Sequence, residues 1–274
     1  FYNKKIISVL SILLLALFNY LYPVFFNQNY LMFLDVGQGD SILIHSKDKT
    51  MLVDTGGVMN YSREKWQERK NKKSLTNYVT IPVLKKLGIR KIDYLVLTHG
   101  DFDHMGEALK LIKQYRVEDI YLNQGNFNLL EKKVIKKYRH VYQIREKEEI
   151  VFGNINIVQI NKEFSDENDS SSVLLMYYKN KKILLTGDAS KKSEEYILNK
   201  YNIGKIDVLK IGHHGSKTST SDELLEELRP SLAIISCGKN NRFNHPHKET
   251  IDKLKEYRIK YLRTDISGTI RIDL

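Results

Sequence analysis

Four side chains that can bind metal ions fall within one short segment of the sequence. The segment runs, in order, His99, Gly100, Asp101, Phe102, Asp103, His104. This spacing lets His99 and Asp101 face one metal ion, while Asp103 and His104 face a second ion a few ångströms away. A metal pair lowers the pKa of bound water and holds the centre that is attacked. The segment therefore predicts a metal-dependent hydrolase, against the plainer interpretation of a polar helix-capping loop.

Three further segments place an ionisable side chain at the end of an expected strand. Asp188 follows one apolar run, where its carboxylate would bridge two metals; taken alone it would be an ordinary turn residue. His213 and His214 follow another run. Because neighbouring residues of a strand point in opposite directions, we expect one histidine to ligate and the other to meet substrate. Asp169 precedes a further strand and offers a carboxylate. Together with the first segment, these residues predict one binuclear site.

The composition restricts both the ligands and the partners. The chain of 274 residues has a single cysteine, Cys237, which excludes an internal disulfide and a cysteine-cluster metal site. A content of 42% hydrophobic and 28% charged residues excludes a wholly disordered or collagen-like chain. The formal net charge of +11 favours a polyanionic partner such as nucleic acid, phosphates or an anionic membrane. Histidines and carboxylates must therefore hold any metal.

The first thirty residues differ in character from the rest. Ile6 to Phe26 contain no charged residue, and at about 1.5 Å per residue a helix of this length spans roughly 30 Å, enough for a bilayer core. A core helix would carry more polar residues, and a signal peptide would end in a cleavage site. We therefore predict a transmembrane helix at about 6–26, within a segment 1–29.

The flanks of this helix predict its orientation. Lys4 and Lys5 precede it, so the positive-inside rule places the N-terminal flank in the cytoplasm and residues 30–274 outside. The sequence opens with Phe1 and not Met. We expect it to be the tail of a longer polypeptide.

Residues 30–274 are predicted to form one mixed α/β domain. Strands are expected at Tyr30–Val36, Ser41–His45, Ile92–Leu97, Asn154–Ile160, Ser172–Tyr178, Lys182–Leu185, Asp207–Ile211 and Leu232–Ser236. Helices are expected at Tyr78–Leu87, Gly106–Tyr115, Asn128–Tyr138, Lys191–Tyr201, Asp222–Leu228 and Lys248–Tyr257. Early strands form hairpins and later ones alternate with helices, which favours mixed sheets covered by helices. The charged run Arg63–Lys73 fits a solvated excursion or a nucleic-acid contact.

A second group of histidines lies near the C-terminus. His245 and His247 flank a proline at the start of an expected helix, among many basic residues. A histidine at such a position can hold a phosphate oxygen or protonate a leaving alkoxide. A surface helix cap is the plainer interpretation.

The order of these motifs resembles that of the metallo-β-lactamase superfamily. A finer resemblance is to the C-terminal domain of the ComEC competence family, the membrane channel proteins of bacterial DNA uptake. The likeness to the superfamily rests on segments 98–106, 186–188 and 212–216, and the finer one on segments 33–41, 53–57, 168–175, 212–216, 244–247 and 264–270. They cover nearly all of residues 30–274, in family order and after a transmembrane segment. The resemblance implies an αβ/βα metallo-β-lactamase sandwich of two mixed sheets, with metals at the sheet edges.

The resemblance also implies a ligand for each metal. His99 and Asp101 would bind the first ion, Asp103 and His104 the second; Asp188 would bridge, and His213 or His214 would complete the second site. The superfamily usually has histidine at the position of Asp101 and a further histidine near Asp169. Oxygen in place of nitrogen shifts preference from zinc toward manganese or magnesium. We expect two divalent ions, manganese or zinc, with magnesium as a third option. The expected role of Asp35, Gln38, Asp40 and Asp54 is to support the site from nearby turns.

The expected function is that of a deoxyribonuclease domain in a DNA-uptake channel protein. Catalysis would rest on Asp103, His214, His245 and His247, the histidines stabilising or protonating the leaving oxygen. In the family this activity is taken to degrade the DNA strand that is not imported during transformation. The implied partners are single-stranded or fraying DNA, the membrane, the upstream channel portion of the same polypeptide and other DNA-uptake proteins. The domain would lie on the extracellular side of the cell membrane.

Two alternatives remain open at the level of the sequence. One is a metallo-hydrolase for another substrate, such as a phosphorylcholine-type ester, a lactone or a β-lactam. The other is a non-catalytic module that guides DNA past a vestigial site.

Overall fold

The computed structural model describes the backbone of residues 2–25, 29–57 and 74–274, and the side chains of the same ranges apart from 2–3 and 19–25. Helix α1 (Tyr2–Phe25) comes first, and its described apolar side chains are exposed. Among the described residues, no helix combines the length and the apolar character that a membrane crossing requires. The predicted span at 6–26 reaches beyond the described side chains and stays a prediction. The charged run at 63–73 lies outside the described residues.

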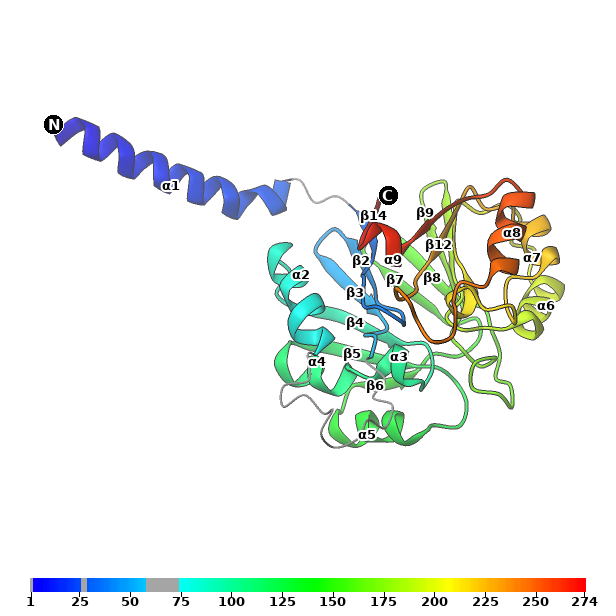
Figure 1. Ribbon diagram of the computed structural model, residues 1–274. Helices are drawn as coiled ribbons and strands as arrows, with labels where there is room; N and C mark the ends of the chain where they lie inside the picture. The colour runs from blue at the N-terminus through cyan, green and yellow to red at the C-terminus, as the bar shows by residue number, and fades with distance from the viewer. Residues whose placement is uncertain (1, 26–28, 58–73) are drawn as a thin grey trace, which may run out of the picture.

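Two seven-stranded sheets form the centre of the molecule (Figure 1). The first sheet has the order β14-β1-β2-β3-β4-β5-β6. Its strands are β1 (Tyr30–Phe33), β2 (Ile42–Ser46), β3 (Lys49–Val53), β4 (Ile92–Leu97), β5 (Val117–Leu122), β6 (Val141–Gln143) and β14 (Ile270–Asp273). Pairing is antiparallel from β14 to β3 and parallel from β3 to β6.

The second sheet repeats this plan. It has the order β13-β12-β11-β10-β9-β8-β7. Its strands are β7 (Glu149–Phe152), β8 (Ile155–Gln159), β9 (Leu174–Tyr178), β10 (Lys181–Leu185), β11 (Val208–Lys210), β12 (Leu232–Ile235) and β13 (Lys260–Arg263). Pairing is antiparallel from β7 to β10 and parallel from β10 to β13. Each half of the molecule is thus a meander followed by parallel crossovers.

Strand alternation divides the apolar side chains between two layers. Ile42 and Ile44 of β2 face the core shared by the two sheets, which also contains Phe33 and Phe152. Leu43, between them, belongs to the cluster beneath the helices of the first sheet. This period of two is what a strand imposes when both faces of its sheet are covered. The core between the sheets holds the two halves together.

Helices cover the outer face of each sheet (Figure 1). The first sheet is covered by π-helix η2 (Thr76–Thr80), α2 (Ile81–Lys86), α4 (Ala108–Gln114) and α5 (Leu129–Lys137). The second is covered by α6 (Lys191–Lys200), α7 (Asp222–Leu228) and α8 (Lys248–Glu256). Three short helices lie in the connecting segments: α3 (Phe102–Met105), 3₁₀ helix η3 (Gly212–Gly215) and α9 (Thr264–Ser267).

The predicted two-sheet α/β sandwich is therefore confirmed, and each predicted helix has its counterpart. Six strands were not predicted, and four of them (β6, β7, β13 and β14) are the edges of the two sheets. Edge strands are short and half exposed, so they lack an apolar run long enough to identify them. Parallel strands β4, β10, β11 and β12 all end at the edge where the ionisable segments begin.

Candidate metal centre

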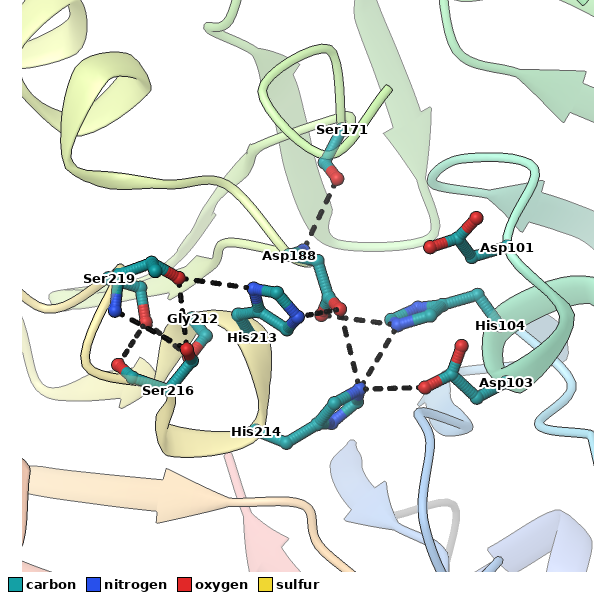
Figure 2. A network of polar contacts seen from close by, with 12 residues as sticks. Asp101, Asp103, His104, Ser171, Asp188, Gly212, His213, His214, Ser216 and Ser219 are labelled. Atoms are coloured by element: carbon teal, nitrogen blue, oxygen red, sulfur yellow. Dashed lines mark hydrogen bonds and ion pairs between the residues drawn. The ribbon is translucent and has the colours of Figure 1, made fainter. Parts of the chain in front are cut away.

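Four buried side chains converge between the ends of the two sheets. One ligand atom from each of Asp40, His104, Asp188 and His214 lies within 4.8 Å of all the others. Asp40 precedes β2 and His104 follows β4, so two residues come from the first half. Asp188 follows β10 and His214 follows β11, so two come from the second. Figure 2 shows three of the four meeting from different segments.

Hydrogen bonds to the outer ring nitrogens orient both histidines. His104 Nδ1 lies 2.8 Å from Asp54 Oδ2, and His214 Nδ1 lies 2.9 Å from the carbonyl oxygen of Ser236. Since both partners accept, each Nδ1 donates, and each neutral ring presents the lone pair of Nε2 to the centre. The two Nε2 atoms are 3.3 Å apart. Two lone pairs at this separation repel each other unless a proton or a cation lies between them.

Asp188 completes this arrangement from the second half. Its Oδ1 lies 3.1 Å from His104 Nε2, and its Oδ2 lies 3.5 Å from His214 Nε2. Burial raises the pKa of Asp188, but the charges of His104 and His214 outweigh it and hold that pKa well below its usual range. Burial likewise lowers the pKa of His104, but Asp188 and Asp54 raise it well above normal. Without a metal, protons on the histidines balance the carboxylates; a metal ion would replace them.

Lys210 is a member of the centre that the sequence analysis missed. Its side chain is fully buried at the end of β11, and Nζ forms an ion pair with Asp40 Oδ2. Nζ also donates to the carbonyl oxygen of Gly187 at 2.8 Å and lies 3.7 Å from Asp188 Oδ1. Burial lowers the pKa of Lys210, but Asp40 and Asp188 outweigh it and raise that pKa. The sequence signal that could have identified Lys210 is its position as a single charged residue among the apolar residues of β11.

His99 and Asp101 lie together beside this cluster, as their spacing predicts. His99 is fully buried, and its ring centre is 4.1 Å from that of His104. Its Nε2 lies 3.7 Å from Asp101 Oδ2 and has no hydrogen-bond partner within the described part of the chain. The Asp101 side chain is 47% exposed. A first metal would therefore be bound at a more open position than the four-residue cluster.

Asp103 lies next to the cluster. Its Oδ2 is 3.4 Å from His214 Nε2. Burial raises the pKa of Asp103, but the hydrogen bond from His214 and the charges of both histidines lower it to about 2. A carboxylate that stays ionised beside His214 fits either predicted role, ligand or catalytic group.

The prediction that His213 and His214 point in opposite directions from a strand is wrong. His213 and His214 do not lie in a strand but in η3, with left-handed φ values of 47° and 53°. Their side chains therefore do not point in opposite directions: His213 Nε2 is 3.7 Å from Asp188 Oδ2, close to the 3.5 Å of His214 (Figure 2). Left-handed backbone in two successive non-glycine residues costs about 1–3 kcal/mol each. Such strain is typical of a functional site.

The remaining predicted residues lie around the centre. Asp169 accepts a hydrogen bond from Ser190 and is not one of the four clustered residues. His245 is 9% exposed, with its ring 5.5 Å from that of His213. His247 Nδ1 accepts from the backbone N–H of Lys217 at 3.1 Å.

The supporting turns are mostly as predicted. Asp35 accepts from the backbone N–H of Gly37, Gln38 accepts from that of Gly238, and Asp54 orients His104. Asp40 differs from the other three, because the structure places it inside the cluster.

The loop that carries His99 and Asp101 is held from outside by the start of α5. The Asn128 side chain donates to the Gly100 carbonyl at 2.7 Å and caps α5, while Glu131 Oε2 accepts from the Asn128 backbone N–H at 2.7 Å. A Cβ at Gly100 would come within 2.0 Å of Asn128 Nδ2. A larger residue at this position would therefore displace the Asn128 side chain from the carbonyl between His99 and Asp101.

Glu131→Gln is expected to stabilise the protein in alkali and not in acid. Burial raises the pKa of Glu131 from 4.5 to about 7. Above pH 4.5 the Glu131 carboxyl group ionises in the unfolded chain but stays protonated in the folded one. The free energy of unfolding therefore falls as the pH rises, and this loss is complete above about pH 7. Glutamine keeps an acceptor oxygen without the charge. In thermal melts with a chelator, Tm should exceed that of the parent at about pH 8.5 and match it near pH 5. Glu195→Gln, on the exposed side of α6, is the control; an equal Tm difference at both pH values would contradict this account.

The donor set fits divalent metal ions. Asp40 Oδ1, His99 Nε2 and His245 Nδ1 are buried and have no hydrogen-bond partner among the described residues. Polar atoms left in this state are costly unless a bound group satisfies them. Imidazole nitrogens combined with carboxylate oxygens suit zinc and manganese, and extra oxygens favour the harder ions.

Comparisons with known proteins show the family to which this chain belongs. The sequence model of a family described as the metallo-beta-lactamase superfamily matches residues 34–239. The chain is 37% identical over 263 residues to ComE operon protein 3 of Bacillus subtilis (strain 168), covering 92% of this chain and 34% of that protein. It is 34% identical over 241 residues to Recombination protein 2 of Haemophilus influenzae, covering 88% of this chain and 28% of that protein. It is 31% identical over 242 residues to Competence protein ComA of Neisseria gonorrhoeae, covering 88% of this chain and 31% of that protein. The chain thus spans about a third of the length of these relatives.

Solved structures share the fold. The metallo-beta-lactamase fold protein YhfI of Bacillus subtilis matches with a TM-score of 0.58 at 12% identity, over 89% of this chain and all of that one. CmlA, a diiron beta-hydroxylase from Streptomyces venezuelae, matches with a TM-score of 0.58 at 15% identity, over 90% of this chain and 54% of that one. At these identities the likeness concerns the fold alone.

Proposed function

This chain belongs to the metallo-β-lactamase superfamily, and we propose that it is a metal-dependent nuclease domain of a membrane protein for DNA uptake. The observation that carries the metal-dependent part is the pair of Nε2 atoms of His104 and His214, 3.3 Å apart beside Asp188. Two observations support DNA as the substrate. The names of two relatives refer to recombination and to competence, and the net charge of the chain is +11.

The residues of the centre have separable roles in this proposal. Bound metal ions, two of them, would supply Lewis acidity and activate water for attack on phosphorus. His104, Asp188 and His214 would hold an ion, with Asp40 beside them, and His99 and Asp101 would hold the more exposed one. Lys210 fixes the two carboxylates of Asp40 and Asp188 from the buried side. Manganese, zinc or magnesium would serve, with the oxygen-rich ligand set favouring the harder ions.

Other residues would act on the phosphodiester itself. His213 has its pKa lowered by burial, against the opposing charge of Asp188, and it is partly exposed. Burial, with the neighbouring charge of His214, likewise lowers the pKa of His245 to about 4. Neutral imidazoles at the rim can donate a hydrogen bond to a phosphate oxygen or to the departing alkoxide without adding a fixed charge. His247 would orient His245, because their ring centres are 4.9 Å apart.

The cellular setting follows from the same proposal. α1 would anchor the domain in the cell membrane, with the metal centre on the extracellular side. The upstream portion of the polypeptide would form the channel, and the nuclease would degrade the strand that is not imported. Other DNA-uptake proteins would deliver single-stranded or fraying DNA to the site.

The decisive experiment compares substrates and metals on the purified 274-residue chain in a mild detergent. Manganese, magnesium or zinc is expected to support cleavage of single-stranded DNA, and a chelator is expected to abolish it. Phosphorylcholine-type esters and lactones serve as parallel substrates. Hydrolysis of those esters with intact DNA would replace the proposal with the other-ester hydrolase. DNA binding without cleavage under every metal would replace it with the guiding module.

A further inference from the structure

A polar cleft of about 580 Å³ opens beside the metal centre. Its walls come from the segment 238–246, which follows β12, and from residues 263–266 around α9. Its lining includes Lys239, Asn240, Asn244, His245, Arg263 and Ile266.

His245 connects the cleft to the centre. It lines the cleft, and its ring centre lies 5.5 Å from that of His213 and 6.3 Å from that of His214. On its other side Phe243 stacks against it, with ring centres 5.6 Å apart. His245 is buried, and its Nδ1 has no hydrogen-bond partner in the described ranges. A substrate held by the metal centre would therefore continue past His245 into the cleft.

Hydrogen bonds within the segment 238–246 define the shape of the cleft. The Asn241 side chain accepts from the backbone N–H groups of Phe243 and His245, and donates to the carbonyl of Gly238 at 2.8 Å. A Cβ at Gly238 would lie 2.7 Å from the backbone nitrogen of Gln38. The segment 238–246 is thus packed against the turn that leads to Asp40. Because its backbone is already held in place, the segment loses less conformational entropy when a ligand binds in the cleft.

The lining chemistry fits one nucleotide. Lys239 is exposed and has neither an ion-pair nor a hydrogen-bond partner within residues 29–57 and 74–274. Arg263 binds Asp265, which also lines the cleft, through two N–H donors and keeps further N–H donors that a phosphate can use. Ile266 is 72% exposed and offers an apolar surface to a base. The exposed amides of Asn240 and Asn244 each carry a donor and an acceptor, so they can meet the edge of any base.

We propose that this cleft binds the nucleotide next to the bond that is cut, its phosphate at Lys239 and Arg263 and its base against Ile266. The inference rests on the proposed nuclease function and deepens it. Such a cleft would bind any base with little preference while it holds the phosphate at one position. Lys239 and Ile266 act here as positioning residues, since neither reaches the metal centre.

Binding is measured by fluorescence anisotropy with a labelled 12-residue oligothymidylate, in the presence of a chelator, so that it does not depend on catalysis. Lys239→Glu is expected to weaken binding about tenfold and to reduce the salt slope by about 1. Ile266→Ser is expected to weaken binding about threefold with the slope unchanged, because it removes only apolar contact. Lys113→Glu is the control: it makes the same charge change on an exposed position of α4, over the other sheet.

Cleavage kinetics with manganese give a second measurement. Lys239→Glu is expected to raise KM about tenfold and to leave kcat within about twofold. If Lys239→Glu and Lys113→Glu weaken binding equally, the cleft has no special role, although cleavage by the parent would still support the nuclease. A parent chain that cleaves no DNA with any metal would instead refute the proposed function.

Discussion

Asp188→Asn is expected to lower metal-dependent DNA cleavage by at least about 10³-fold without unfolding the protein. The amide has the size of the carboxylate, so the packing at the end of β10 is retained. It lacks the charge that stands between His104 and His214, 3.1 and 3.5 Å from their Nε2 atoms. A metal ion at this position would lose its central anionic ligand.

Two measurements separate loss of metal from loss of chemistry. Isothermal titration with manganese is expected to show metal affinity lowered by roughly 100-fold or more, and circular dichroism should show an unchanged fold. Asp252→Asn is the matched control, because Asp252 is an exposed carboxylate of α8 that pairs only with Lys248 among the described residues. A variant that binds manganese and cuts DNA at the parental rate would remove Asp188 from the site.

Lys210→Met is expected to destabilise the metal-free protein by about 3–5 kcal/mol. Methionine matches the length of the lysine stem, but it leaves Asp40 and Asp188 buried without their shared cation. An uncompensated buried charge of this kind is among the most costly single changes in a fold. A divalent ion can replace the missing charge. Manganese is therefore expected to restore much of the lost stability in urea titrations.

A double-mutant cycle identifies the cause. Asp40→Asn combined with Lys210→Met removes both members of the ion pair, and the double variant is expected to be more stable than Lys210→Met alone. Ile211→Met, at the adjacent buried position, is the control for packing. If the urea midpoint of Lys210→Met equals that of the parent in the presence of a chelator, the ammonium group of Lys210 does not stabilise the buried carboxylates of Asp40 and Asp188.

The sequence predicts the part of the site that is local in the chain. His99 and Asp101 lie together because they are only two positions apart in the chain, directly after the end of β4. The sequence predicts only a supporting role for Asp40, because nothing in its own turn shows that the fold brings His104 beside it. Apolar runs predict mixed sheets covered by helices, and the family resemblance implies that the sheets form a two-layer sandwich.

Lys210 and the histidine pair show why the rest was not predicted. A single lysine in a strand normally lies at the surface, and its burial becomes evident only when Asp40 and Asp188 are placed around it. The positions of His213 and His214 depend on left-handed backbone that the local sequence favours weakly. In both places tertiary structure overrides the local preference.

The even division of the four clustered residues has a consequence for how the two halves interact. Asp40 and His104 belong to the half built on the first sheet, Asp188 and His214 to the half built on the second. An ion bound by all four would be a cross-link between two halves that also meet through apolar side chains such as Phe33 and Phe152 and through the ion pair of Lys210 with Asp40. By linkage, metal affinity then contains the free energy of sheet-to-sheet docking. A core substitution remote from every ligand would change metal affinity as surely as a change in the ligands themselves.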